Sequence, residues 1–145
     1  MIDQYSETTS SCTALIEKMK ANATATLSRL LGDWRAQPGE VMVDLCSGTD
    51  EGCLFALSRG AVSAIGINLS GGENGLARAH LPGAAFLGTD LATDLQGVAD
   101  NSVDRIMALN ILEHIDKQLL APMLERAARV LKPSDYLVAM TPNAG

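Results

Sequence analysis

The chain has 145 residues, a formal net charge of −6 and 47% hydrophobic residues, which fits one domain that buries most of the surface of its unfolded chain. Its Lys and Arg residues are scattered singly along the sequence. A nucleic-acid partner, which needs a basic face, is therefore not expected. No segment approaches the ~18 consecutive apolar residues of a membrane span, so a membrane partner is not expected either.

The cysteines exclude two further kinds of protein. Cys12, Cys46 and Cys53 form no C-x-x-C pair and are odd in number, so neither a disulfide framework nor a metal site is predicted. The first residues, from Met1 to Tyr5, lack the basic and apolar regions of a secretory signal. These features predict a cytoplasmic location.

A long amphipathic helix is predicted from about residue 11 to residue 31. Its apolar residues recur at spacings of three and four, which marks one face of a helix. They are Leu15, Ile16, Met19, Ala23, Leu27, Leu30, Leu31 and, just beyond, Trp34. Gly32 and then Pro38 follow and should end the helix. We expect residues 1–37 to be a helical segment that packs on a core of residues 38–145 within a single domain, 1–145; closing over a ligand is the alternative.

The stretch from Val41 to Gly52 passes from an apolar run through a polar turn into a helix. A β-branched apolar run bounded by turn residues is typical of a buried parallel strand. Asp50 stands where an N-cap side chain would accept N–H groups of the following helix. In open α/β sheets such a turn lies at the carboxyl edge, where ligands bind. This turn is therefore the predicted ligand site.

The rest of the chain alternates apolar runs with turns and helical patterns. Further strands are predicted at 61–67, 84–87, 103–109 and 136–141, and helices near 73–80 and over 119–131. Pro122 should kink the last helix or mark its first turn. This alternation predicts an α/β fold, with a doubly wound parallel sheet covered by helices on both faces.

Over about residues 41–143 the chain also resembles the class I S-adenosylmethionine-dependent methyltransferases. The motifs that carry the resemblance follow the family's order: Asp44-Leu45-Cys46-Ser47-Gly48-Thr49, Gly66-Ile67-Asn68-Leu69-Ser70, Asp90-Leu91, Val103-Asp104-Arg105-Ile106, Asn110-Ile111-Leu112-Glu113-His114-Ile115, Arg129-Val130-Leu131-Lys132-Pro133 and Thr141-Pro142-Asn143. The resemblance implies a Rossmann-like sheet of strand order 3-2-1-4-5, truncated at Gly145 before the usual sixth and seventh strands. We expect either a fragment or a shortened protein.

The resemblance also implies which residues bind the adenosyl part of S-adenosylmethionine. Asn68 stands where the family has an acidic residue that accepts the ribose hydroxyls, and Leu69 follows it in the same motif. Asp90 would accept the adenine amino group, and Leu91 would pack on the ring.

Other residues would lie at the methionine end of the cofactor. Gly48 would let the backbone approach the methionine part, since a Cβ would intrude there. Asp44 would order the loop or reach the cofactor's ammonium group through water, and Cys46 is small enough to replace a loop glycine. Asn110 would line the methyl-transfer end. Catalytic residues are not identified, with Glu113 and His114 as weak candidates for a general base.

Three positions depart from the family pattern. Cys46 and Asp50 replace two of the three loop glycines, and Asn68 replaces the acid that binds the ribose. Asp50 would place a carboxylate near that of the cofactor, and like charges repel. Asn68 would lose the charge-assisted character of the ribose hydrogen bonds.

The predicted function is methyl transfer to an oxygen or nitrogen atom of a small-molecule substrate, a reaction that needs chiefly an aligned approach. A catalytically inactive relative with a binding or regulatory role is the alternative, because of these departures. An NAD-dependent oxidoreductase is disfavoured, since no G-x-G-x-x-G follows the first strand. Without a seventh strand, residues 136–140 would form an exposed apolar edge, which predicts a homodimer through this strand.

Overall fold

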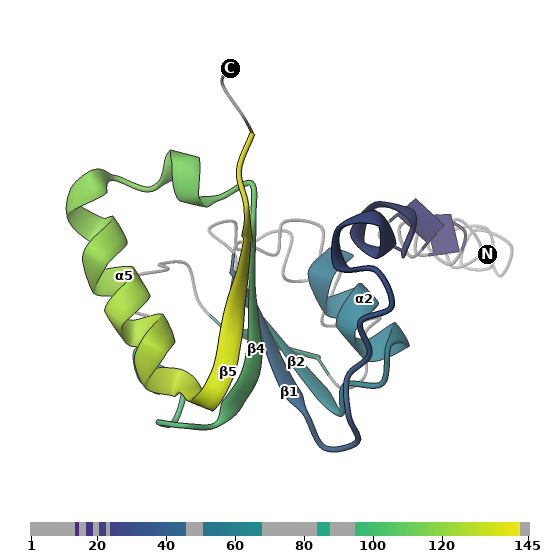
Figure 1. Ribbon diagram of the computed structural model, residues 1–145, viewed down its shortest axis with the longest axis horizontal. Coiled ribbons are helices and arrows are strands. Elements are labelled where there is room, and N and C mark those ends of the chain that lie inside the picture. Colours follow the sequence, from purple (N-terminus) through teal and green to yellow (C-terminus); the bar gives the residue numbers. More distant parts are fainter. Residues whose placement is uncertain are drawn as a thin grey trace, which may run out of the picture.

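The computed structural model describes residues 14, 17, 18, 21, 22, 24–45, 51–67, 84–87 and 95–142. A 5-stranded parallel sheet with the order β3-β2-β1-β4-β5 forms its centre (Figure 1). The strands are β1 (Val41–Leu45), β2 (Ser63–Ile67), β3 (Ala84–Leu87), β4 (Val103–Leu109) and β5 (Leu131–Met140). The strand order predicted from the resemblance is confirmed. The helix predicted near 73–80 lies outside the described residues.

Helices cover both faces of the sheet (Figure 1). Helix α2 (Glu51–Ser58) lies on one face together with the N-terminal helical residues, and α5 (Lys117–Val130) lies on the other. Side chains of a strand point alternately to the two faces, and β1 follows this rule. Met42 packs in the cluster around α2, whereas Val43 packs in the cluster around α5. Both faces of β1 are buried, which explains its continuous apolar run.

The N-terminal helix is confirmed where it is described. Residues 24–31 are helical and Gly32, with a φ of +56°, follows them. Leu27 is buried in the α2 cluster, and Trp34 stacks on Phe55 with their ring centroids 5.9 Å apart. Leu30, predicted on the apolar face, is instead 45% exposed. The segment therefore packs on the α2 side of the sheet, but through a narrower stripe than the sequence indicated.

Helix α5 begins at Lys117, two residues earlier than the apolar pattern indicated. The side chain of Asp116, its N-cap residue, accepts a hydrogen bond of 2.9 Å from the N–H of Gln118. Pro122 therefore lies inside the helix, so of the two alternatives for this residue the place in the first turn is wrong. Met123, Ala127 and Val130 recur at helical spacing and are buried against β4 and its neighbours. The prediction missed Lys117 and Gln118, because the cap residue and not apolar spacing defines the start of this helix.

Strand β5 also begins earlier, at Leu131 instead of Tyr136. Its pairing with β4 is irregular, because Val103 pairs with Leu131 whereas Arg105 pairs with Tyr136. Four residues of β5 thus stand opposite one residue of β4, and Ser134 among them has a φ of +73°. Turn-forming residues fill this bulge, which is why the sequence predicted a turn there. Among the described helices, none is long and apolar enough to cross a membrane.

Candidate functional site

The carboxyl edge of the sheet brings together two of the predicted cofactor residues. Asp44 is the penultimate residue of β1, and Asn110 directly follows β4. The two strands are neighbours, and Leu45 of β1 pairs with Ala108 of β4. Asn110 therefore lies two positions beyond the level at which β1 ends. This edge, next to the central strand of a doubly wound sheet, is the place where such folds bind ligands.

Asp44 is a buried carboxylate at this edge. It is 4% exposed and points to the α2 face, since its paired neighbour Met107 packs in the α2 cluster. Gly52, the second residue of α2, lies directly against it. A Cβ added at Gly52 would lie 2.6 Å from Cγ of Asp44, closer still to its Oδ2, and 3.0 Å from Cε of Met107. Only glycine at this position lets the first turn of α2 approach the carboxylate.

Asn110 has a left-handed backbone with a φ of +52°, a conformation that asparagine tolerates better than most residues. Its N–H donates a hydrogen bond of 2.8 Å to the carbonyl oxygen of Met140, the last residue of β5. This bond holds the end of β4 against the end of β5. Asn110 itself is exposed, so its amide is accessible at the carboxyl edge.

Glu113 and His114 lie in the 3₁₀ helix η2 (Leu112–His114), which follows Asn110. Their nearest charged atoms, Oε1 of Glu113 and Nε2 of His114, are 4.0 Å apart, and the His114 side chain is 72% exposed. The His114 side chain therefore lies mostly in solvent. Within the described ranges, no group of three or more His, Cys, Asp or Glu residues could hold a metal ion.

The remaining predicted site residues lie outside the described residues, and so does Asp50. They are Cys46, Gly48, Asn68, Leu69, Asp90 and Leu91. Their assignments stay predictions.

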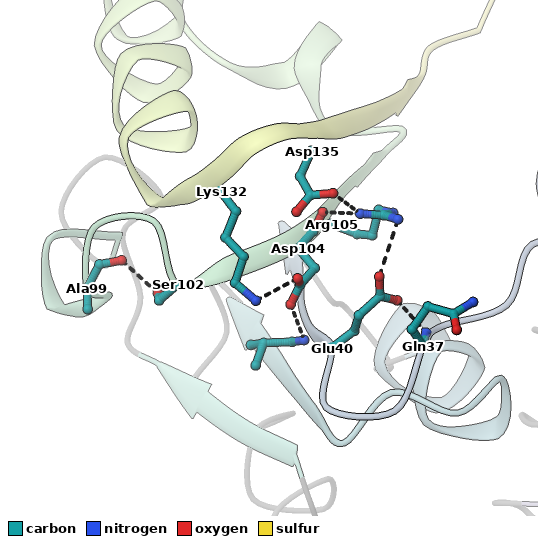
Figure 2. A network of polar contacts seen from close by, with 9 residues as sticks. Gln37, Glu40, Ala99, Ser102, Asp104, Arg105, Lys132 and Asp135 are labelled. Carbon is teal, nitrogen blue, oxygen red and sulfur yellow. Dashed lines mark hydrogen bonds and ion pairs between the residues drawn. The ribbon is translucent and has the colours of Figure 1, made fainter.

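A second buried aspartate, Asp104, lies at the opposite, amino edge of the sheet (Figure 2). Its Oδ1 accepts a hydrogen bond of 2.6 Å from Nζ of Lys132, and its Oδ2 accepts one of 2.7 Å from the N–H of Val41. Burial by itself would raise the pKa of Asp104. The hydrogen bonds from Lys132 and Val41, with the charges of Lys132 and Arg105, outweigh burial and hold the pKa below its ordinary value. The carboxylate thus joins the first residue of β1 to the bulge of β5.

Arg105 extends this amino-edge network on the other side of β4 (Figure 2). Its guanidinium forms ion pairs with Asp135 and, at 3.3 Å, with Glu40, and lies 4.5 Å from the ring centroid of Tyr136. Burial alone would lower the pKa of Arg105, but the contact with Tyr136 and the nearby carboxylates raise it. The network therefore connects the turn before β1 with the bulge of β5.

Gly52 is not among the site residues predicted from the sequence. The predicted glycine, Gly48, belongs to the loop motif, whereas Gly52 lies inside the helix that follows. A glycine within the first turn of a helix was the available signal, because glycine is unfavourable there unless close packing requires it. Asp104 and Lys132 were noted only as parts of motifs.

The strand order and the ligand-binding edge define a Rossmann-like α/β fold of the methyltransferase type. A sequence profile described as a methyltransferase domain matches residues 42–134. The chain belongs to this family, the S-adenosylmethionine-dependent methyltransferases, as its motifs predicted, and S-adenosylmethionine is the cofactor of the family. Comparison with curated proteins gives no match.

Solved structures share the fold. An S-adenosylmethionine-dependent methyltransferase from Archaeoglobus fulgidus matches with a TM-score of 0.73 at 20% identity, over 86% of this chain and 54% of that one. A phosphoethanolamine N-methyltransferase 2 from Haemonchus contortus, solved with phosphomonomethylethanolamine and S-adenosylhomocysteine, has a TM-score of 0.65 at 20% identity, over 83% and 28%. The [4+2]-cyclase SpnF gives 0.66 at 21%, over 79% and 43%. This chain thus spans about half, or less, of the length of these relatives.

Among the described residues, one buried carboxylate at the carboxyl edge is compatible in charge with the family's cofactor. The methionine part of S-adenosylmethionine carries an ammonium group, for which a buried carboxylate is a suitable acceptor. Asp44 is such a carboxylate, at the carboxyl edge of the first strand. The close approach of Gly52 leaves no room for a side chain beside it.

Proposed function

We propose that this chain is an S-adenosylmethionine-dependent methyltransferase, or the cofactor-binding part of one, that methylates an oxygen or nitrogen atom of a small molecule. The observation that carries the proposal is the buried Asp44 at the carboxyl edge of β1, in a chain whose sequence matches the methyltransferase domain family. Asp44 would hold the cofactor's ammonium group, directly or through water. Asn110 would line the methyl-transfer end.

The cofactor would supply an activated methyl group on a positively charged sulfur. In methyl transfer the acceptor's lone pair forms a bond to this carbon while the carbon–sulfur bond breaks, and its electron pair stays on sulfur. The protein's part is to align the acceptor and exclude water. Such a reaction needs no strong general base, which agrees with the exposed His114. A protein of this kind therefore depends on binding residues more than on a conspicuous catalytic group.

A small-molecule acceptor is supported by the Haemonchus relative, which was solved with phosphomonomethylethanolamine. The alternative is a relative that transfers no methyl group. It is supported by the changed positions Cys46, Asp50 and Asn68, and by the [4+2]-cyclase SpnF, which shares the fold. A cytoplasmic location is proposed from the sequence alone.

Calorimetric titration of the chain with S-adenosylmethionine, S-adenosylhomocysteine and NAD tests the cofactor. We expect both adenosyl amino acids to bind and NAD not to bind. Gly48→Val should abolish binding without unfolding the protein, because its branched side chain would fill the cofactor's space. Binding of NAD alone would overturn the proposal, and so would failure of the folded chain to bind any of the three.

Asn68→Asp tests the ribose site. An aspartate offers two anionic acceptors in nearly the same volume, so this change should tighten S-adenosylmethionine binding roughly fivefold. Adding Asp50→Gly should tighten it further by removing a like charge near the cofactor's carboxylate. If both variants stay folded and neither binds more tightly, the ribose is not held at the end of β2.

A homodimer through β5 is the proposed partner arrangement. In the described sheet β5 is an edge strand, and its Tyr136 is 42% exposed. An unpaired apolar edge can add a strand from a second copy. Light scattering should show a dimer that Ala139→Lys, a charge on the exposed edge strand, dissociates. Ala128→Lys on the exposed side of α5 is the control; a wild-type monomer at high concentration would contradict the arrangement.

A further inference from the structure

Gly52 makes an unusual contact with the proposed cofactor site. It is buried in the first turn of α2, and its missing side chain would lie between Asp44 and Met107. A Cβ there would be 2.6 Å from Cγ of Asp44. Ordinary non-bonded carbon contacts are about 3.5–4.0 Å, so an alanine cannot be accommodated unless something moves.

The helix is held too firmly to move. The four residues after Gly52 are all buried, with exposed fractions of 0–5%, and they are Cys53, Leu54, Phe55 and Ala56. Phe55 stacks on Trp34, and the guanidinium of Arg59 lies 5.0 Å from the centroid of the Phe55 ring. Shifting α2 outwards would open a cavity in this cluster, at a cost that rises with its volume.

The strand is held equally firmly. β1 is the central strand, paired along its length with β2 and β4. Met107, the third partner in the contact, is 1% exposed and packs among the α2 cluster. The group that can yield is therefore the Asp44 carboxylate, by rotation about its side-chain torsions.

We infer that Gly52 is a positioning residue for cofactor binding: its missing side chain leaves the space in which the Asp44 carboxylate takes the orientation that receives the ammonium group of S-adenosylmethionine. This inference rests on the proposed function. The third glycine of the Rossmann fingerprint allows close helix–strand packing in a comparable way. Here the approach sets the direction of an acidic side chain rather than only the distance between two elements.

The test measures affinity by calorimetry for two ligands, S-adenosylmethionine and 5′-methylthioadenosine, which lacks the amino-acid part. Gly52→Ala should weaken S-adenosylmethionine binding roughly tenfold or more, because an ionic hydrogen bond is lost. The affinity of the Gly52→Ala variant for 5′-methylthioadenosine should stay unchanged. Gly97→Ala is the matched control, since a Cβ at Gly97 would meet nothing within 4 Å. Equal weakening of both ligands by Gly52→Ala would overturn the inference.

A double-mutant cycle separates positioning from a structural role. In Asp44→Ala the carboxylate is absent, so adding Gly52→Ala should cause no further loss of S-adenosylmethionine affinity. If Gly52→Ala fails to fold, Asp44→Ala/Gly52→Ala should restore folding by removing the clash. A double variant that stays unfolded, or loses affinity additively, would overturn the inference. A folded wild type that binds neither ligand would instead refute the proposed function on which it rests.

Discussion

Two buried aspartates lie at the two ends of strand β1. Asp44 is within β1 at its carboxyl end, and Asp104 of β4 contacts the first residue at its amino end. Asp104 is 7% exposed and Asp44 is 4% exposed. Asp104 accepts hydrogen bonds from Lys132 and Val41 and lies beside the ion pairs of Arg105. Asp44 lies against Gly52, so closely that a Cβ on Gly52 would be 2.6 Å from its Cγ.

The two edges therefore differ in what they do with a buried charge. At the amino edge the network joins the start of β1, β4 and the bulge of β5 (Figure 2), which makes it a clamp for the fold. At the carboxyl edge a glycine makes room for the carboxylate, and the neighbouring Asn110 is exposed. The carboxylate at the amino edge therefore stabilises the fold, whereas for the one at the carboxyl edge we propose a role in ligand binding.

The largest expected effect is on stability at the amino edge. Asp104→Ala should lower the free energy of unfolding, measured in urea, by about 2–3 kcal/mol, because the part-buried N–H of Val41 loses its acceptor and the ion pair to Lys132 is lost as well. Asp100→Ala is the control: Asp100 pairs with Arg129, but its side chain is 65% exposed. The loss of unfolding free energy in Asp100→Ala should be below about 1 kcal/mol. Equal losses would remove the distinction between clamp and surface pair.

The complementary change at the carboxyl edge should affect binding. Asp44→Asn keeps the volume but removes the charge, so S-adenosylmethionine affinity should fall roughly tenfold. Asp104→Asn should leave the affinity unchanged. Calorimetric titration measures the affinity of both variants, and urea unfolding measures their stability. The comparison fails if Asp104→Asn weakens binding as much as Asp44→Asn does.

Acid should weaken the clamp. The pKa of Asp104 is held below its ordinary value of 3.8, so the folded state favours the charged form. The resulting stabilisation is complete above that ordinary pKa and is lost as the pH falls through the lower pKa of the folded state. The stability difference between wild type and Asp104→Asn, about 1 kcal/mol near neutral pH, should shrink steadily below about pH 4. A difference that stays constant down to pH 2 would show that charge contributes nothing.

The smallest expected effect on stability comes from the bulge of β5, which contains Lys132 and Asp135 of the amino-edge network. Ser134 has a left-handed backbone, with a φ of +73°, which costs a residue with a Cβ about 1 kcal/mol. Ser134→Gly should therefore raise the free energy of unfolding by about 0.5 kcal/mol after the larger unfolded-state entropy of glycine is counted. Ser134→Ala, which removes the hydroxyl but keeps the Cβ, should give no gain. A gain from alanine as well would assign the effect to the hydroxyl.

Much of the fold could be predicted from the sequence because local patterns carry it. The apolar run of β1 and the helical spacing in α5 appear as predicted, and the strand order is the one that the family resemblance implied. Element limits were less predictable. The start of α5 depends on the cap residue Asp116. The start of β5 comes before a bulge whose residues are typical of a turn. Caps and bulges are set by single contacts, which periodicity does not record.

For the site, the sequence by itself determined that Asp44 lies near the end of one strand and that Asn110 follows another. The two residues therefore share the carboxyl edge of a parallel sheet. It also determined the family, through motifs in a fixed order. Only the tertiary structure decided that Gly52 packs on Asp44, and that Asp104 meets Lys132, 28 residues away. Spacing along a chain fixes which edge or face a residue occupies, whereas the partner it meets there depends on how strands and helices pack in space.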